Sequence, residues 1–205
     1  MLKIWGRLSS INVQKVIWCC DELALKYERV DVGGKFGGNN TPEYLRMNPN
    51  GLVPTIEEDG FVLYESNAIV RYLAARDPQA RLFPADLRER ADVDRWMEWS
   101  TTYALAMRDL FWQLIRTPAA DRDARAIDVS REKTEKLTGI LDAHLADREW
   151  MAAGRFSAAD IVVGCAAHRW LLLPVEHEDR PHVRRWYEAL KARPASHQVT
   201  LQPLS

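Results

Sequence analysis

The stretch NPNGLVPTIEEDGFVLYESNAIVRYL, residues 48–73, decides the fold of the first part of the chain. It holds two runs of alternating apolar residues separated by Asp59-Gly60, a dipeptide suited to a type I′ turn because both central positions require a positive φ. The two runs therefore predict a β-hairpin. We expect Ser66 to cap the helix that follows. The inner face of that helix is expected to hold Ala68, Ile69, Tyr72 and Leu73.

The chain before the hairpin predicts a strand, a helix and a second strand. LKIW at residues 2–5 favours a short buried strand, and residues 12–25 have helical spacing. The apolar face of this helix is expected to hold Val13, Val16, Ile17, Cys20 and Ala24. YERVDV at residues 27–32 alternates as a second strand, which pairs in parallel with the first in a βαβ unit. Residues 33–51 are rich in Gly, Asn and Pro and predict a loop around a short helix, and loops of this composition often carry ligands.

The remainder of the chain predicts only helices. Two prolines and several charges in the stretch DPQARLFPADLRER predict a linker over residues 79–87. We therefore expect an α/β domain of β-α-β, loop, β-β-α order over residues 1–78 and an all-helical domain over residues 88–205. The long helical segments are residues 86–117, 123–147, 158–173 and 182–194. Ser157 and Asp160 have the spacing of a capping pair at a helix start, worth about 1 kcal/mol.

Charge and hydropathy exclude several classes of function. The chain has 205 residues and a net charge of -1, from 28 basic and 29 acidic side chains, so nothing favours nucleic acid or an anionic membrane surface as a partner. No apolar run approaches the roughly 20 residues that span a bilayer, and the first residues lack the features of a signal peptide. We expect a cytoplasmic protein that acts on neutral small molecules or proteins, without a metal site.

The three cysteines are expected to be reduced thiols. Cys19, Cys20 and Cys165 cannot form an even set of disulfides, and neighbouring cysteines rarely bridge. Cys20 falls on the apolar face of the first helix, with Cys19 at its margin. A CxxC motif is absent. The adjacent pair is therefore predicted to pack rather than to exchange disulfides.

The order of the predicted elements, together with four short motifs, resembles a cytosolic glutathione transferase of the bacterial, serine-dependent theta-, zeta- or nu-like kind. The motifs are Val53-Pro54 before a hairpin strand, Glu65-Ser66 at a helix start, the capping pair of the helical part and a serine near the end of strand one. Each is weak alone and specific in this order, and the resemblance covers essentially the whole chain. It implies a thioredoxin-like first domain, a helical domain that forms the electrophile pocket, and a homodimer.

The resemblance also implies how glutathione, the co-substrate, is bound. The peptide bond before Pro54 is expected to be cis, with the backbone N–H and C=O of Val53 free to pair with the cysteinyl backbone of glutathione as an added strand. Glu65 suits the γ-glutamyl ammonium. The N–H and hydroxyl of Ser66, at a helix N-terminus, suit the γ-glutamyl carboxylate. Lys35, in the glycine-rich loop, is the candidate for the glycyl carboxylate.

Glutathione transferases lower the pKa of the bound thiol, because the thiolate is the nucleophile. A thiol with a pKa of about 8.5 is only about 3% ionised at pH 7, and a pKa of about 7 makes it about half ionised. That shift corresponds to about 2 kcal/mol, which one hydrogen bond to a charged group, at about 1.5–3 kcal/mol, supplies. The N-terminus of the first helix, expected at Asn12 or Val13, adds to the effect.

Ser10 is the first candidate for the thiol's hydrogen-bond donor. No tyrosine stands near the end of strand one, and both the theta-like and the nu-like patterns align the stretch SINVQKV on Ser10. Asn12 is the second candidate, through its amide, and Ser9 matches one serine of the zeta-like double-serine motif. The alternative is that Ser10 or Asn12 only caps the first helix.

The electrophile pocket is expected beside the thiolate, on the first helix of the helical domain. The resemblance places Tyr103, Met107 and Trp112 there, with Arg108 as a positive end for an anionic substrate. The same spacing is also typical of a bundle core.

The leading functional hypothesis is the addition of glutathione to an electrophilic small molecule. One alternative is a glutathione-dependent peroxidase or disulfide reductase of the nu-like kind, suggested by Asn12. Another is a non-catalytic glutathione-transferase-like module that binds proteins. Leu52 supports that module, because many relatives have a polar or basic residue before the valine.

Overall fold

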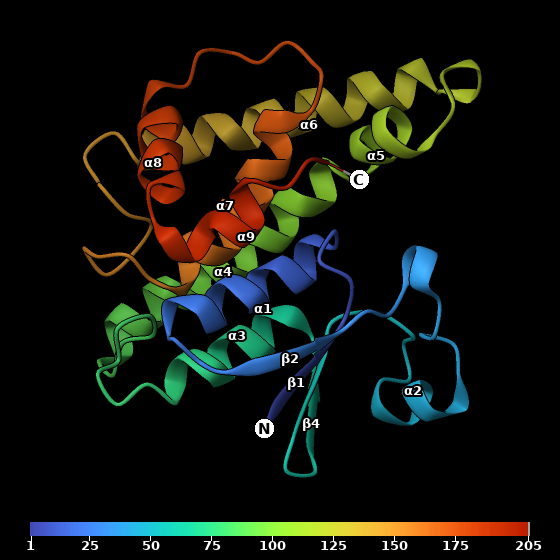
Figure 1. Cartoon of the computed structure of the whole chain (residues 1–205). Helices are drawn as coiled ribbons and strands as arrows, with labels where there is room; N and C mark the ends of the chain where they lie inside the picture. The colour runs from blue at the N-terminus through green and yellow to red at the C-terminus, as the bar shows by residue number, and fades with distance from the viewer. Residues whose placement is uncertain (205) are drawn as a thin grey trace.

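A four-stranded mixed sheet forms one end of the molecule in the computed structural model, which describes residues 1–204 (Figure 1). The strands are β1 (Leu2–Trp5), β2 (Tyr27–Val30), β3 (Thr55–Glu58) and β4 (Phe61–Tyr64), in the spatial order β2-β1-β3-β4. β1 pairs in parallel with β2, whereas the β1–β3 and β3–β4 pairs are antiparallel. The predicted βαβ unit and hairpin are therefore confirmed, with positive φ at both Asp59 and Gly60 of the turn.

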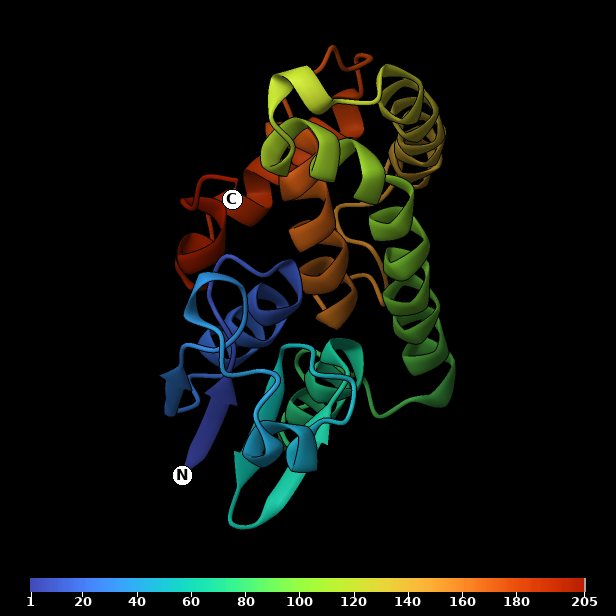
Figure 2. The same cartoon turned by 90° about the vertical axis from the view of Figure 1, so that its right-hand side faces the viewer.

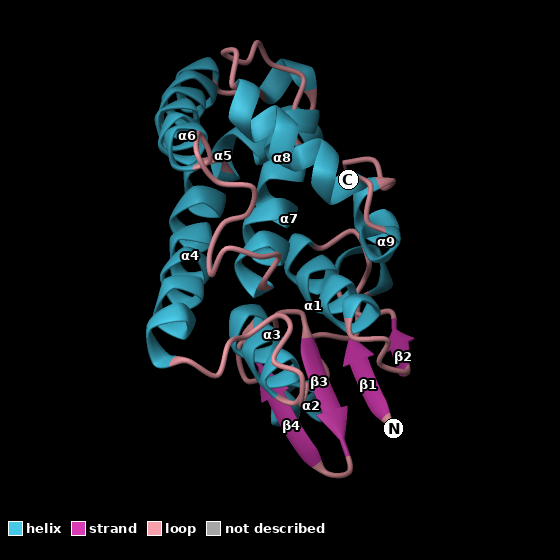
Figure 3. Ribbon diagram, turned by 90° about the vertical axis from the view of Figure 1, so that its left-hand side faces the viewer, coloured by secondary structure: helices cyan, strands magenta, loops and turns pink. Residues whose placement is uncertain are grey.

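Two helices cover one face of the sheet, and Figure 3 shows both of them above the strands. They are α1 (Ile11–Glu22) and α3 (Ser66–Ala75), while the short α2 (Pro42–Met47) and the 3-10 turn η1 (Gly34–Phe36) lie in the connection between β2 and β3. The predicted face of α1 is fully buried at Val13, Val16, Ile17 and Cys20. Ala24 is not part of it, because the helix ends before this exposed residue, which has a φ of 53°.

The start of α3 differs by one residue from the prediction. Glu65 occupies the N-cap position with a φ of 72°, and Ser66 is the first helical residue, so Ser66 does not cap the helix. Of its predicted inner face, Ile69 and Leu73 are fully buried, whereas Ala68 and Tyr72 are only partly covered.

The second part of the chain is all-helical, as predicted. Its elements are α4 (Leu87–Ala106), α5 (Arg108–Phe111), a π-helical turn η2 (Trp112–Arg116), η3 (Ala119–Asp121), α6 (Ala124–His144), α7 (Ala158–Leu172), α8 (Pro181–Lys191), η4 (Pro194–Ser196) and α9 (His197–Thr200). The single long helix expected over residues 86–117 is instead interrupted at Met107, between α4 and α5.

Helix α7 joins the two parts of the molecule. In Figure 2 it stands above α1, and it packs against both α1 and α4. Its first turn carries the predicted capping pair, in which the buried Asp160 carboxylate accepts from the backbone and hydroxyl of Ser157. The same carboxylate accepts from Met151 N–H and Trp186 Nε1 at 2.9 Å each. Burial raises the pKa of Asp160 to about 6, although these donors act in the opposite direction.

The C-terminal segment returns to the first helix. The Nε and Nη2 atoms of Arg193 each donate to the Glu22 carboxylate at 2.7 Å, and the Gln198 amide donates to Asp21. These contacts tie the end of the helical domain to the end of α1.

The cysteines pack in the interior. Cys19, Cys20 and Cys165 are all buried free thiols, so Cys19 is not at the margin of α1 but inside. Burial raises the pKa of Cys20 to about 12, and it also raises the pKa of Cys19, which leaves both thiols un-ionised near neutral pH. Within residues 1–204, no helix has the length and apolar character needed to cross a membrane.

Candidate functional site

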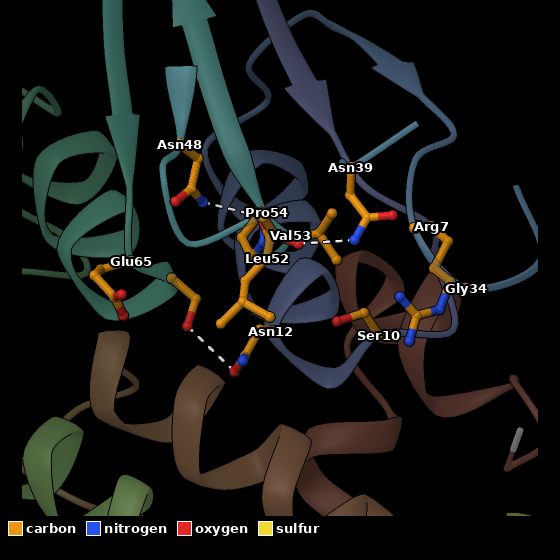
Figure 4. Close-up of a pocket in the computed structure, with 13 residues that line it drawn as sticks. Arg7, Ser10, Asn12, Gly34, Asn39, Asn48, Leu52, Val53, Pro54 and Glu65 are labelled. Atoms are coloured by element: carbon orange, nitrogen blue, oxygen red, sulfur yellow. Dashed lines mark hydrogen bonds between the residues drawn. The ribbon is translucent and has the colours of Figure 1, made fainter. Parts of the chain in front are cut away.

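A cavity of about 230 Å³ lies where β1 leads into α1 and β4 leads into α3. Figure 4 shows Ser10, Asn12 and Glu65 around Val53 and Pro54 in this cavity. Its walls bring together most of the residues predicted to activate the thiol or to bind glutathione: Ser10, Asn12, Val53, Pro54, Glu65 and Ser66. We call it the first cavity.

The Ser10 hydroxyl is free to act on a ligand. Ser10 is the N-cap residue of α1 by position, and its backbone C=O accepts from Gln14 N–H at 2.9 Å. Its side chain makes no capping bond and has no hydrogen-bond partner within residues 1–204. The hydroxyl therefore lies in the cavity with its donor unused, beside the positive end of the α1 dipole.

Val53 presents its backbone to the same cavity. The Val53–Pro54 peptide bond is cis, and neither the N–H nor the C=O of Val53 has a backbone partner in the described part of the chain. The neighbouring Leu52 C=O is held from behind, by the Tyr44 hydroxyl at 2.6 Å and by Asn48 Nδ2 at 2.9 Å. Tyr44 and Asn48 are buried, so their hydrogen bonds hold the backbone at Leu52 and Val53 in a fixed position, to which an extended peptide can add as a strand.

The start of α3 forms the opposite wall. Glu65 holds a left-handed φ of 72°, which costs a non-glycine residue on the order of 1–3 kcal/mol. The first N–H groups of α3 face no earlier helical turn, so they are available to an anion. Ser66 Oγ donates to Asn12 Oδ1 at 3.3 Å, and the Nδ2 amide nitrogen of Asn12 remains available to donate to a ligand.

Arg7 is a member of this cavity that the sequence did not indicate. Its guanidinium packs on the backbone of Gly34, where an added Cβ would lie only 2.8 Å from Arg7 Nε. Gly34 also has a φ of 58°, so a side chain at this position would be strained and would displace Arg7. The sequence offered one indication that Arg7 belongs to this cavity, namely its position with Ser10 in the short connection between β1 and α1.

Lys35 lies outside the residues that line the cavity. It is exposed on η1, and its Nζ stands 5.1 Å from the Phe36 ring centroid. The adjacent Gly34 does line the cavity, so Lys35 lies beside its rim.

A second cavity of about 540 Å³ adjoins the first, and Asn12, Glu65 and Ser66 line both. Its walls come from α1, α3, α4, α5 and α7. Of the four residues expected to line an electrophile pocket, Arg108 lines this second cavity.

The other three residues lie elsewhere. Tyr103 and Met107 are fully buried, and the Tyr103 hydroxyl bonds Thr138 Oγ1 at 2.9 Å. Trp112 is 53% exposed in the π-helical turn, outside the lining of the second cavity. Tyr103 lies on the side of α4 that contacts α6, and Trp112 lies beyond the interruption of the helix at Met107.

No cluster in residues 1–204 groups three or more His, Cys, Asp or Glu side chains in a way that could hold a metal ion. The donors and acceptors of the first cavity are instead hydroxyl, amide, carboxylate, guanidinium and backbone groups. This donor set suits a small peptide that carries charges of both signs.

Two family models match the chain. One is described as the N-terminal domain of glutathione S-transferase and matches residues 5–81, and the other, its C-terminal domain, matches residues 102–194. The chain is 40% identical, over an alignment of 208 residues, to glutathione S-transferase GstB of Escherichia coli (strain K12), with 100% of each chain covered. It is 29% identical to probable glutathione S-transferase GSTF2 of Oryza sativa subsp. japonica, with 97% of this chain and 95% of that one covered.

Solved structures agree with these matches. The theta class glutathione S-transferase of Xanthomonas axonopodis pv. citri, with glutathione bound, superposes with a TM-score of 0.95 at 44% identity, over 100% of this chain and 99% of that one. Glutathione transferase F7 of Populus trichocarpa gives a TM-score of 0.86 at 30% identity, over 98% of each chain. The resemblance and the fold class expected from the sequence are confirmed, and the chain belongs to the glutathione S-transferase family.

Proposed function

We propose that this glutathione transferase binds glutathione in the first cavity, ionises its thiol beside Ser10 and adds the thiolate to an electrophilic small molecule in the second cavity. The observation that carries the proposal is the unbonded Ser10 hydroxyl at the N-terminus of α1, in one cavity with the unpaired backbone of Val53. The glutathione-bound relative from Xanthomonas, at 44% identity, supports the choice of co-substrate.

Each part of glutathione has a complementary group in the first cavity. Its cysteinyl backbone pairs with the N–H and C=O of Val53, as an added strand. Its γ-glutamyl carboxylate takes the free N–H groups at the start of α3, beside Ser66, and its ammonium faces Glu65. Lys35, beside the rim, remains our proposal for the glycyl carboxylate.

The Ser10 hydroxyl donates a hydrogen bond to the thiolate, and Asn12 is the second candidate for this role. The thiol proton passes to water when the thiol ionises. The sulfur lone pair then forms the bond to the electrophilic carbon, and the electron pair displaced there departs with the leaving group or, in an addition to a double bond, moves to the neighbouring atom, which water protonates. Arg7 and the α1 dipole place positive charge in the same cavity, which favours the thiolate over the thiol.

The test is the pKa of the glutathione thiol bound to the Ser10→Ala variant, followed by the ultraviolet absorbance of the thiolate. Loss of a hydrogen bond of about 1.5 kcal/mol or more raises that pKa by about one unit or more. Ser9→Ala is the matched control, because Ser9 does not line the first cavity. An unchanged pKa in Ser10→Ala would remove Ser10 from the mechanism.

Kinetics separate conjugation from its closest enzymatic alternative. Turnover of a hydroperoxide or a disulfide, without turnover of an aromatic halide, would replace the conjugation proposal by a nu-like peroxidase or reductase. Failure of all of these reactions, with binding of glutathione retained, would favour the non-catalytic module.

We also propose that the protein is a cytoplasmic homodimer. An apolar groove between α4 and α6 includes Leu105, which is 59% exposed, and Val129, which is 42% exposed. Burial of such a surface against a second copy removes it from water. Sedimentation of the wild type as a dimer and of Leu105→Asp as a monomer is the expected result, and a wild-type monomer would contradict it. Cell fractionation tests the location.

A further inference from the structure

The second cavity carries an excess of positive charge and shares Asn12 with the first cavity. Asn12, Glu65 and Ser66 line both cavities, and Asn12 is the second candidate for the donor to the thiol, so the two cavities share the part of the site next to Ser10. Its charged lining consists of Lys15, Arg71, Arg108 and Arg169 against Glu65 and Glu98.

Two of the four cations have carboxylate partners. Arg71 pairs with Asp94 and Glu98, and Arg108 pairs with Asp109 at 3.2 Å. These pairs also account for Glu98. Glu65, the remaining acid, is proposed above as the partner of the glutathione ammonium. Lys15 and Arg169 are therefore left without a carboxylate of their own.

Lys15 is a buried cation in the lining of the second cavity. It is only 3% exposed, and Asn67 Oδ1, at 3.3 Å from Nζ, is a neutral partner. Its pKa is lowered to about 8, chiefly by burial, and Arg169 also lowers it, whereas Glu65 and Glu98 raise it. Burial of an ammonium group without an acid is costly, so an anionic ligand would relieve an existing cost.

Arg169 stands on α7, where its guanidinium covers the Phe111 ring at 4.1 Å. Within residues 1–204, no hydrogen bond or ion pair engages its side chain. Its pKa is lowered to about 10 by burial, and the nearby charges of Arg116 and Arg7 lower it further. The contact with the ring limits the movement of the guanidinium, and a guanidinium held in this way is well suited to bind both oxygens of a carboxylate.

We propose that the electrophile accepted by this enzyme carries a carboxylate, which Arg169 and Lys15 bind while the electrophilic carbon faces the thiolate beside Ser10. The inference rests on the proposed transferase function and narrows its substrate class. It assigns the positive end of the electrophile site to α1 and α7 rather than to Arg108.

The test compares two activated aryl chlorides that differ in one group, a chlorodinitrobenzoate and the chlorodinitrobenzamide of the same substitution pattern. In both reactions the sulfur forms a bond to the ring carbon and chloride leaves with the electrons of the C–Cl bond. We expect kcat/KM to be at least about tenfold higher for the carboxylate, the effect of one charge-assisted hydrogen bond. The uncatalysed rate of each probe is subtracted.

The variants Arg169→Gln and Lys15→Met locate the preference. Arg169→Gln is expected to lower kcat/KM for the carboxylate about ten- to hundredfold, and Lys15→Met about tenfold. Both variants should change kcat/KM for the carboxamide less than about threefold and leave KM for glutathione unchanged. Arg184→Gln on α8, an exposed cation outside both cavities, is the charge-matched control and should change neither probe.

A measurement on the wild type does not depend on the folding of any variant. Dinitrobenzoate, which has no leaving group, should compete with the electrophile at least about tenfold more tightly than dinitrobenzamide. Turnover of the carboxamide with no preference for either carboxylate would overturn the inference and leave the transferase function standing. Equal losses for both probes in Arg169→Gln would also overturn it. Turnover of neither probe by the wild type would overturn both proposals.

Discussion

Ser66 Oγ donates a hydrogen bond to Asn12 Oδ1 at 3.3 Å, and this contact joins the first turn of α3 to the first turn of α1. The two helix N-termini that face the first cavity are thereby held in one orientation. The Asn12 amide therefore links two parts of the proposed glutathione site. One is Ser66, proposed to receive the γ-glutamyl carboxylate, and the other is the N-terminus of α1, proposed to receive the thiol.

Asn12→Ala separates a positioning role of Asn12 from a role on the thiol. Without its partner, the Ser66 hydroxyl becomes free to rotate, so we expect KM for glutathione to rise about threefold to tenfold, the loss of one hydrogen bond. The pKa of the bound thiol should rise less than in Ser10→Ala. A larger rise in Asn12→Ala than in Ser10→Ala would assign the thiol to Asn12 instead.

Tyr44→Phe tests the support behind Val53. The Tyr44 hydroxyl bonds both the Leu52 C=O, at 2.6 Å, and Thr55 Oγ1, at 3.0 Å, and its loss allows the Val53 backbone to shift. We expect KM for glutathione to rise several-fold with kcat unchanged, and the free energy of unfolding to fall by about 1 kcal/mol.

Tyr187→Phe is the control for this variant, because Tyr187 also bonds a buried partner, His168 Nδ1, at 2.6 Å, but lies far along the chain on α8. It should lose a similar amount of stability with no change in KM. A KM for glutathione that stays constant in Tyr44→Phe would show that the bend keeps its shape without this hydroxyl.

Glu65→Gln tests the ammonium contact with a matched pair of thiols. Glutathione and glutaryl-cysteinyl-glycine differ only in the amino group that Glu65 is proposed to bind. The wild type should prefer glutathione at least about tenfold in kcat/KM, the effect of a hydrogen bond between charged groups. Glu65→Gln should remove most of that preference. If the variant discriminates as the wild type does, the ammonium binds elsewhere.

Lys15→Met should stabilise the protein near pH 7. Since the pKa of Lys15 is lowered to about 8 in the folded chain, the unfolded chain binds more protons between that pH and its own pKa near 10.5. Stability from this group therefore rises with pH through that window, by about 3 kcal/mol in total. Methionine matches lysine as far as the Cε atom and removes the ammonium group.

Chemical denaturation of wild type and Lys15→Met at several pH values is the measurement. The variant should be more stable by about 1–3 kcal/mol at pH 7, and the difference should shrink as the pH approaches 10. A constant difference across this range would mean that Lys15 does not titrate in the window stated. The variant gains stability at the expense of the proposed electrophile site, a common relation between stability and function.

Local sequence signals predicted much of the fold. Asp59-Gly60 specified the hairpin because its two positions tolerate positive φ, and Asp160 specified the start of α7 because the capping pair has a fixed spacing. Such signals depend on neighbours in the chain. The interruption at Met107 had no comparable signal, since neither glycine nor proline stands there and the helical spacing of apolar residues continues past it.

Short motifs predicted which residues lie together in the first cavity. Ser10, Val53 and Glu65 belong to such motifs and do line the first cavity. The charges that arrive from distant elements were not predicted: Lys15 occupies a buried position of an apolar helix, and Arg169 reaches the cavity only because α7 packs against α1. The net charge of -1 indicated neutral partners. The net charge of the whole chain contains no information on where two cations without carboxylate partners lie in the fold.

The two hydrogen bonds between Arg193 and Glu22 connect the end of the chain to its beginning. Through these bonds the last turns of the helical domain hold the C-terminal end of α1, and Ser10 lies at the N-terminal end of the same helix. The two domains on either side of the linker are therefore not expected to separate before the chain unfolds. We therefore expect thermal unfolding to occur in one cooperative transition. Loss of the Arg193–Glu22 hydrogen bonds should increase the mobility of α1, including Ser10 at its N-terminus.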